Sequence, residues 1–204
     1  MTKFDAKDVK KLRDMTSAPM MDCKKALQEN DGDFDKAKDW LRKKGMATAD
    51  KAASREVKEG KLFSYVHHNG KVGVLVEVVC ETDFVAMNEE FQAFGKGLCL
   101  TITAFSPAFL DRESVDSQAI EKEQQLVTEQ TKENMKGKPD NVVEKAVAGR
   151  MDKFFQAQCL MEMGYVNPLD QSDTRTVEQV RKELVGKIGE NIQVRRYTRM
   201  ELGG

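Results

Sequence analysis

Apolar residues in the first 45 positions recur at helical spacing in three short groups, separated by residues that favour turns. Pro19 separates the first two groups, because proline disfavours helix in the residue before it, and residues 30–33 separate the second from the third. This pattern predicts three short helices in a compact bundle, with Trp40 in its interior. The apolar positions are Val9, Leu12 and Met15; Cys23, Ala26 and Leu27; and Phe34, Ala37 and Leu41.

Residues 46–60 are charged and rich in alanine, and we interpret them as a linker with some helix. A linker here divides the chain into a first domain over residues 1–53 and a second over residues 54–204. Beyond it the period of the apolar residues changes from helical to strand-like.

A β-hairpin is predicted where residues 62–67 and 71–80 flank Asn69 and Gly70. This pair is the one best suited to the positive φ angles of a tight hairpin turn.

The second strand of the hairpin carries apolar residues on both faces. Leu75 and Val79 occupy one face, so we expect a central strand that is covered on both sides. Residues 191–202 are prone to β-structure and predict a third strand beside the hairpin. The other face of the second strand carries Val72, Val74, Val76 and Val78.

Helices are predicted between the hairpin and the third strand. Large apolar residues recur at spacings of three and four until Pro107 ends the first helix. A second, charged and glutamine-rich helix covers residues 120–136, and Asn141 and Glu144 have capping-box spacing at the start of a third, after Pro139. The apolar residues of the first helix are Phe91, Phe94, Leu98, Ile102 and Phe105.

A last helix is predicted from a second capping-box pair, Thr176 and Gln179, to Gly189. The fold class is therefore α+β. We expect an N-terminal three-helix bundle followed by a core in which helices pack on a small antiparallel three-stranded sheet.

Composition narrows the classes of function. The 33 basic residues are balanced by 34 acidic ones, which disfavours direct binding of nucleic acid as the main activity. The longest apolar run, residues 72–80, is far shorter than the ~20 residues of a membrane span. Residues 1–10 hold no apolar signal core, so we expect a cytoplasmic protein that does not enter membranes.

Cysteine and histidine give little sign of a catalytic or metal site. The spacing of the cysteines excludes the usual zinc motifs and argues against a disulfide framework, so we expect reduced core residues. His67 and His68 are adjacent at the first strand of the hairpin and should point to opposite faces. An enzyme that uses Cys80 or Cys99 as a nucleophile stays an alternative with little support. The four cysteines are Cys23, Cys80, Cys99 and Cys159.

No cofactor is predicted. A glycine-rich phosphate loop with Lys and Ser or Thr is missing from the sequence, so the chain is not expected to bind a guanine nucleotide itself.

The segment from Glu81 to Val85 forms a corner between the second strand and the next helix. The pattern alone allows two interpretations. Asp83 could cap the helix with Phe84 in the core, or a rigid corner could display both side chains for a function.

Four groups of residues bear on this choice. The first is Thr82-Asp83-Phe84-Val85 followed by Asn88-Glu89-Glu90-Phe91, and the second is Met20-Met21-Asp22-Cys23-Lys24-Lys25-Ala26-Leu27 with Trp40-Leu41-Arg42-Lys43-Lys44-Gly45. The third is Gly149-Arg150-Met151 with Lys153-Phe154, and the fourth is Gly189-Glu190-Asn191-Ile192. Together they resemble the elongation factor Ts family over nearly the whole chain. The first group is similar to the family's signature, the second to its ubiquitin-associated-like N-terminal domain, and the last two to its core helix and closing strand. The chain departs from the family at Thr101, where many members have His, and at Met163 and Gly164.

This resemblance implies a non-enzymatic guanine-nucleotide exchange factor for the GTPase elongation factor Tu, which it would bind in the GDP-bound and nucleotide-free states. Thr82, Asp83, Phe84 and Val85 would then contact the nucleotide-binding domain of the GTPase. Phe84 would act as an apolar wedge and Asp83 as a polar contact, and together they would disturb the Mg²⁺ site. The N-terminal domain would add contacts through Arg13, Met20 and Met21, although from spacing alone both methionines could equally be core residues.

The resemblance to short members of the family also implies a homodimer that completes the partner-binding surface, with a monomer left open. A different class of function is an adaptor whose three-helix module binds ubiquitin-like or helical ligands. Along the predicted third strand, Arg195, Tyr197 and Arg199 would share one face in a regular strand, and no role is assigned to them.

Overall fold

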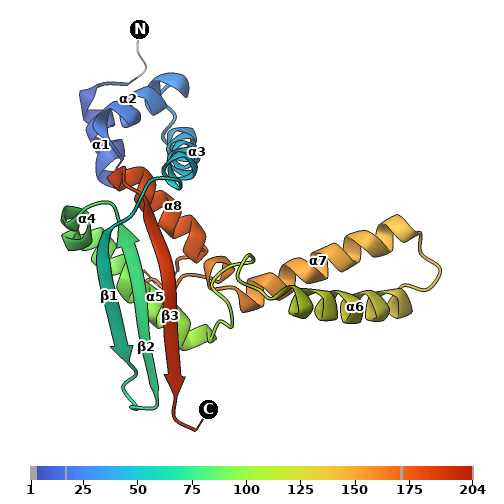
Figure 1. Ribbon diagram of the computed structural model, residues 1–204. Helices are drawn as coiled ribbons and strands as arrows, with labels where there is room; N and C mark the ends of the chain where they lie inside the picture. The colour runs from blue at the N-terminus through green and yellow to red at the C-terminus, as the bar shows by residue number, and fades with distance from the viewer. Residues whose placement is uncertain (1–3, 17, 171, 204) are drawn as a thin grey trace. The chain divides into compact units, whose positions relative to one another are not determined.

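The computed structural model describes residues 4–16, 18–170 and 172–203 (Figure 1). The chain divides into two compact units that are interleaved in sequence. One holds the described residues among 1–63, 76–96 and 179–195, and the other those among 64–75, 97–178 and 196–204. The predicted division at residues 53 and 54 concerns separate folding domains and stays a prediction.

Three helices open the chain as predicted: α1 (Ala6–Thr16), α2 (Met20–Glu29) and α3 (Phe34–Ala52). Asp33 caps α3, because its carboxylate accepts hydrogen bonds from the backbone N–H groups of Asp35 and Lys36, each at 3.1 Å. The predicted apolar faces meet in one buried cluster, which confirms the bundle. Its members are Val9, Leu12, Cys23, Ala26, Leu27, Ala37 and Leu41.

One expectation for this region, the burial of Trp40 in the interior, is wrong. Trp40 is only half-buried, and the ammonium groups of Lys25 and Lys44 lie 5.9 and 5.4 Å from the centre of its ring. So small a bundle does not enclose the indole, which cation–π contacts can stabilise at its edge. The predicted linker holds some helix as expected, since α3 continues to Ala52 and buries both Ala49 and Ala52, and the chain from Ala53 to Lys58 is not helical. Alanine favours helix without marking an apolar stripe.

A three-stranded antiparallel sheet follows, in the order β1 (Glu59–Val66), β2 (Val72–Cys80) and β3 (Ile192–Glu201). The hairpin, the central strand and the third strand are therefore confirmed.

The prediction of a tight turn at Asn69 and Gly70 is wrong. Residues 67–71 connect the strands, and Gly70 is their sole residue with a positive φ, at 68°. Its N–H donates to the carbonyl of His67 at 2.8 Å. A turn followed by one left-handed glycine needs only that residue to be special.

The two faces of β2 differ in burial. Val74, Val76 and Val78 are buried, whereas Leu75 on the opposite face is 45% exposed, so the expectation of a strand covered on both sides is wrong there. The backbone bonds from His67 to Val72 and from Leu202 to Lys71 set a register that places Val66 and Met200 on either side of Gly73. Both side chains are exposed. We call Val66, Leu75 and Met200 the open sheet face.

The alternation of burial in β3 shifts by one position after Val194, because Arg195 and Arg196 are both exposed. Arg195 pairs with Glu77 at 3.5 Å, while the hydroxyl of Tyr197 donates to the carbonyl of Pro107 at 2.8 Å. The expectation that Arg195, Tyr197 and Arg199 share one face is therefore wrong.

The helices between β2 and β3 are α4 (Asp83–Met87), α5 (Glu89–Phe105), α6 (Ser117–Asn134), α7 (Asp140–Gln158), the 3-10 helix η1 (Leu160–Glu162) and α8 (Val177–Ile188). The apolar face of α5 is buried as predicted, apart from Phe105 at its end. Gly189, with a φ of 86°, follows α8 as predicted. The capping box at Asn141 and Glu144 is wrong, since α7 begins before Asn141, directly after Pro139.

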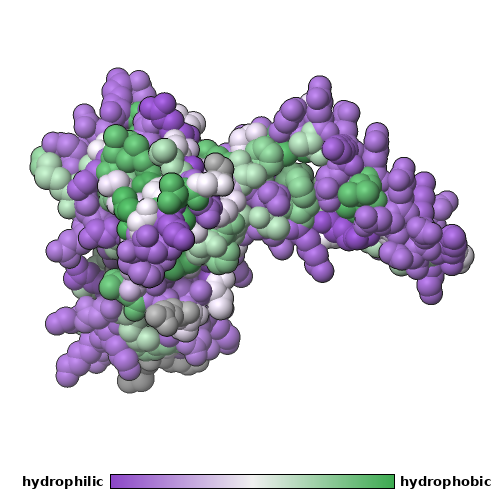
Figure 2. All heavy atoms as spheres, turned by 90° about the horizontal axis from the view of Figure 1, so that it is seen from below, coloured by the Kyte–Doolittle hydropathy of each residue, from purple (hydrophilic) through white to green (hydrophobic). Residues whose placement is uncertain are grey.

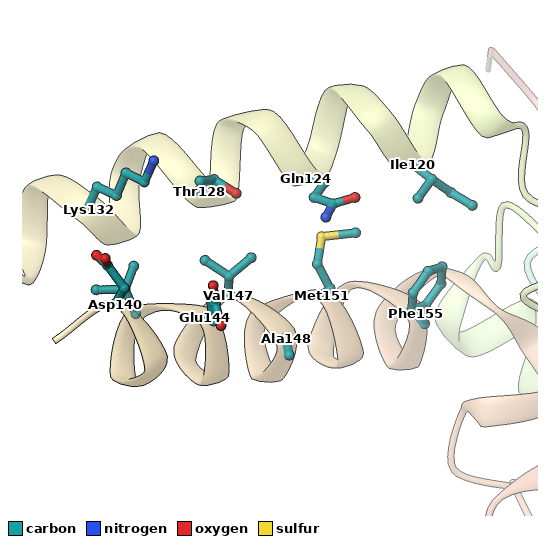
Figure 3. A pocket seen from close by; sticks show the side chains of 11 residues that line it. Ile120, Gln124, Thr128, Lys132, Asp140, Glu144, Val147, Ala148, Met151 and Phe155 are labelled. Carbon is teal, nitrogen blue, oxygen red and sulfur yellow. The ribbon is translucent and has the colours of Figure 1, made fainter.

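The helices α6 and α7 lie side by side as an antiparallel pair, which the sequence did not predict (Figures 1 and 3). Arg150 joins them by donating to Thr131 Oγ1 at 3.2 Å and to Gln130 Oε1 at 2.9 Å. Between the two helices lies a groove whose α7 side is mainly apolar (Figure 3). Its lining includes Ile120, Gln124, Thr128, Val147, Met151 and Phe155. The space-filling view shows the helix pair as mostly hydrophilic with apolar patches (Figure 2). No helix in the described part of the chain combines the length and apolarity that a membrane crossing requires.

Candidate partner-binding site

The corner after β2 is built by two successive caps. Thr82 is the N-cap of α4, and its hydroxyl oxygen accepts from the backbone N–H of Val85 at 3.4 Å. Asn88 ends α4 and caps α5, because its side-chain oxygen accepts from the N–H of Glu90 at 2.8 Å. Asp83 is therefore not the cap, and it begins α4 with an exposed side chain.

Phe84 is 80% exposed, which makes the core interpretation of this residue wrong. The next residue, Val85, is only 7% exposed and anchors α4, while Met87 is 69% exposed. Phe84 and Met87 are three residues apart, so they are neighbours on one side of this short helix. The corner thus presents a phenyl ring and a thioether to solvent beside the Asp83 carboxylate.

Glu190 holds the base of this corner. One oxygen of its carboxylate accepts from the backbone N–H of Thr82 at 3.0 Å, and the other accepts from the Thr82 hydroxyl at 2.8 Å. In return, the carboxylate of Glu81 accepts from the backbone N–H of Asn191 at 2.6 Å. The end of β2 and the segment before β3 therefore exchange carboxylate-to-backbone bonds, which are among the stronger hydrogen bonds in proteins.

Asn191 extends the network to the end of α3. It is fully buried, and its side-chain amide donates to the carbonyls of Arg55 at 2.9 Å and Ala53 at 3.3 Å. The guanidinium of Arg55 donates to the carbonyl of Gly189 at 2.9 Å and to Glu81 at 3.3 Å. Sequence reasoning missed these contacts, because each joins residues far apart in the chain.

The N-terminal candidates lie on the surface of the bundle. Arg13 is exposed, Met20 is 42% exposed and Met21 is 71% exposed, so the interpretation of both methionines as core residues is wrong. Met15 is also 52% exposed, although its spacing had placed it on the apolar face of α1.

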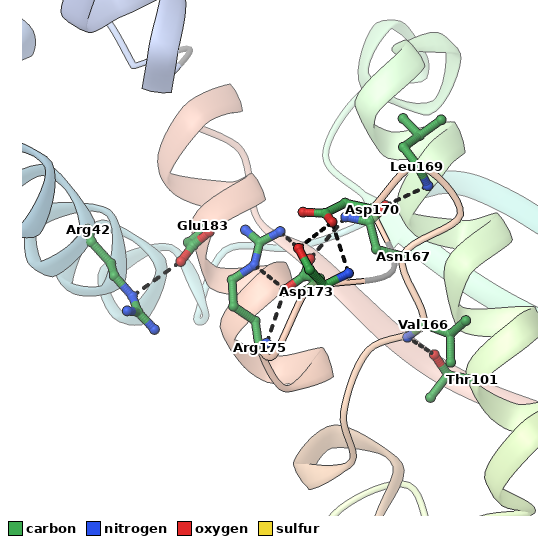
Figure 4. A network of polar contacts seen from close by, with 10 residues as sticks. Arg42, Thr101, Val166, Asn167, Leu169, Asp170, Asp173, Arg175 and Glu183 are labelled. Atoms are coloured by element: carbon green, nitrogen blue, oxygen red, sulfur yellow. Dashed lines mark hydrogen bonds and ion pairs between the residues drawn. The ribbon is translucent and has the colours of Figure 1, made fainter.

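Of the three positions that depart from the family pattern, Thr101 and Met163 are buried and Gly164 is exposed. Thr101 is fully buried; its hydroxyl donates to the carbonyl of Gly97 at 2.8 Å and accepts from the N–H of Val166 at 2.9 Å (Figure 4). Met163 is buried too, and its carbonyl accepts from the N–H of Val177 at 3.0 Å.

The loop before α8 is fixed by Asp173. Its carboxylate accepts from the guanidinium of Arg175 at 2.8 and 2.5 Å and from the amide of Asn167 at 2.9 Å (Figure 4). The hydrogen bonds from Arg175 hold the pKa of Asp173 well below its usual range.

The cysteines and histidines do not form a chemical site among the described residues. All four cysteines are buried and unpaired, and burial raises the pKa of Cys80 and of Cys99 to about 11, so few of these thiols ionise near neutral pH. The rings of His67 and His68 lie in contact, with centroids 4.2 Å apart, so the opposite-face expectation is wrong. Both residues sit in the turn, where strand alternation does not apply. The described residues hold no group of three or more His, Cys, Asp or Glu arranged to bind a metal ion.

Comparison with known proteins gives a consistent match. A family described as "Elongation factor TS" matches residues 43–172. The chain is 48% identical over 200 residues to elongation factor Ts of Fervidobacterium nodosum, covering 98% of each chain. It is 48% identical over 195 residues to that of Thermotoga maritima (96% and 94% covered), and 46% identical over 198 residues to that of Nitratidesulfovibrio vulgaris (97% and 96% covered).

These matches place the chain among the factors of translation elongation. Their names and their near-complete coverage agree with the fold and with the signature at the corner. The chain belongs to the elongation factor Ts family. This family consists of nucleotide-exchange factors for elongation factor Tu rather than enzymes in the usual sense.

Proposed function

We propose that this chain promotes the release of GDP from elongation factor Tu during translation elongation, in the cytoplasm, by inserting Asp83 and Phe84 into the nucleotide-binding domain of that GTPase. One observation carries the proposal: Phe84 is 80% exposed on a backbone corner that Thr82 and Glu190 hold in place. A large apolar side chain held out in this way is suited to filling a pocket on a partner.

The energetics of exchange follow from linkage. A factor that binds the nucleotide-free GTPase better than the GDP-bound form must weaken GDP binding by the same factor. The chain therefore needs no chemistry of its own, only a surface with the right preference.

Each residue of the corner has a distinct part in this mechanism. Phe84 acts as the wedge, and Asp83 beside it makes a polar contact. Thr82 and Val85 fix their direction through the cap and the buried anchor. Insertion of Asp83 and Phe84 would disturb the coordination of the Mg²⁺ ion that the partner binds with its nucleotide, an ion that tolerates little distortion of its oxygen ligands.

The N-terminal bundle adds a second contact through Arg13, Met20 and Met21. Two exposed methionines on α2 support this assignment, because methionine is a flexible side chain that adapts to partner surfaces.

A homodimer through the open sheet face completes the proposal. Val66, Leu75 and Met200 are 68%, 45% and 72% exposed on adjoining strands, an apolar surface that a second copy could cover. A Leu75→Lys variant should then sediment as a monomer where the parent sediments as a dimer. A monomeric parent would remove this part of the proposal alone.

The central experiment is release of a fluorescent GDP analogue from elongation factor Tu, with the parent, Phe84→Ala and Phe105→Ala compared at equal concentration. Phe105 is also an exposed phenylalanine, at 52%, and serves as the matched control. Loss of a pocket-filling aromatic costs ~2 kcal/mol or more, about thirtyfold in equilibrium affinity, so Phe84→Ala should lose most of the acceleration. Its melting temperature should stay at that of the parent.

Two results would contradict the proposal. A parent that does not accelerate release from a cognate partner would favour the adaptor function. A Phe84→Ala variant as active as Phe105→Ala would leave the exchange function intact and remove the wedge.

A further inference from the structure

The helices α3 and α8 approach each other closely at two glycines, Gly45 and Gly186. A Cβ atom added to Gly186 would lie 2.6 Å from the Cα atom of Gly45, a distance that real Cβ atoms do not show. A Cβ atom added to Gly45 would lie 3.8 Å from the Cα atom of Gly186, which is an ordinary contact. The approach therefore depends on glycine at position 186 and tolerates alanine at position 45.

Two ion pairs flank this contact and set its orientation. Arg42 of α3 pairs with Glu183 of α8 at 3.3 Å (Figure 4), and Lys182 of α8 pairs with Asp50 of α3 at 2.7 Å. Each helix supplies one cation and one anion, so sliding α3 along α8 would break both pairs. Partly exposed pairs of this kind contribute little stability, but both can form together only when the two helices are in this register.

The end of α3 is held as well. The carbonyls of Ala53 and Arg55 accept from the buried amide of Asn191, and Glu190, the residue before Asn191, binds Thr82 at the base of the Phe84 corner. A continuous set of contacts thus runs from α3, through α8 and residues 189–191, to the corner.

We propose that Gly186 is a positioning residue for partner binding. It lets α3 seat on α8, so that Met20 and Met21 on the bundle stand at a set distance from Phe84. The inference rests on the proposed function, since it concerns how two partner contacts act together. A second contact that is held in place meets its target at high effective concentration, whereas a contact on a loose tether does not.

The test is a set of affinities for nucleotide-free elongation factor Tu, measured by calorimetry on full-length chains. In the parent, the double change Met20→Ala/Met21→Ala should weaken binding by about tenfold. In a Gly186→Ala background the same double change should weaken binding by less than about threefold, because the bundle no longer presents the methionines. In the matched Gly45→Ala background the full tenfold loss should return. Phe84→Ala should cost the same factor in all three backgrounds.

A charge swap gives a second route that does not depend on how well Gly186→Ala folds. We call the loss of affinity caused by Met20→Ala/Met21→Ala the methionine effect. Arg42→Glu places a like charge against Glu183 and should reduce the methionine effect. Arg42→Glu combined with Glu183→Arg should restore it.

The outcomes separate the two proposals. A methionine effect that is the same in the Gly186→Ala and parent backgrounds, or one that the charge swap does not change, overturns the inference while the Phe84 effect stands. An absent methionine effect in the parent overturns both the inference and the N-terminal contact. A parent that does not bind the partner overturns the proposed function itself.

Discussion

Glu190 binds Thr82 by two hydrogen bonds, although the two residues are 108 positions apart in the sequence. One bond goes to the backbone amide and one to the hydroxyl, so the carboxylate fixes both the path of the chain and the rotamer of the residue that caps α4. The exposed Phe84 ring is two residues further on, and its direction depends on this clamp.

Replacing Glu190 by Ala should loosen the corner. A hydrogen bond to a charged group contributes ~1.5–3 kcal/mol, and two such bonds are lost, so the free energy of unfolding should fall by at least ~1.5–3 kcal/mol in denaturant titrations. Acceleration of GDP release should fall too, because Phe84 is no longer pre-oriented. Glu89→Ala, at an exposed position in the first turn of α5, should change neither quantity. A destabilised Glu190→Ala variant with full exchange activity would show that the clamp has only a structural role.

Replacing Thr101 by Val should destabilise the protein by ~1–3 kcal/mol. The substitution keeps the shape of the side chain but leaves the partly buried N–H of Val166 without its acceptor. Thr101→Ser keeps the hydroxyl and should stay close to the parent. Equal melting of the Val and Ser variants would mean that the hydroxyl contributes nothing.

Asp173 should make the free energy of unfolding depend on pH in the acidic range. Its pKa is lowered in the folded protein relative to ~3.9 in an unfolded chain, so its carboxylate stabilises the fold above that pH and loses this effect as the pH falls further. The unfolding free energy of the parent should therefore drop below about pH 4. Asp173→Asn should be less stable at pH 7 and show a shallower drop, whereas parallel curves for the two proteins would contradict this assignment.

Much of the fold could be predicted from local patterns. The three-helix bundle, the hairpin, the central strand and the face of α5 all follow from apolar periodicity, which depends only on neighbouring residues. The length of α3 did not follow, because Ala49 and Ala52 are small residues whose burial comes from packing rather than from a strong hydrophobic signal. The pairing of α6 with α7 could not be predicted either, because local sequence does not determine which amphipathic helices pack against each other.

The candidate site could be predicted only in part. Family resemblance pointed to Phe84, but pattern alone could not separate a capped core residue from a displayed one, since both Thr82 and Asp83 are residues that cap helices well. The decision depends on Glu190, on the buried Val85 and on the network around Asn191. These are contacts across long stretches of sequence, to which no local rule applies.

The burial of all four cysteines makes the chain suitable for distance measurements between site-specifically attached dyes. A maleimide dye would find no native thiol on the folded surface, so cysteines introduced at exposed positions such as Lys10 on α1 and Glu89 on α5 would take the label cleanly. Energy transfer between two such dyes would report the spread of distances between the bundle and the corner. A narrow distribution already present in the free protein would mean that the factor meets its GTPase with both contacts in place.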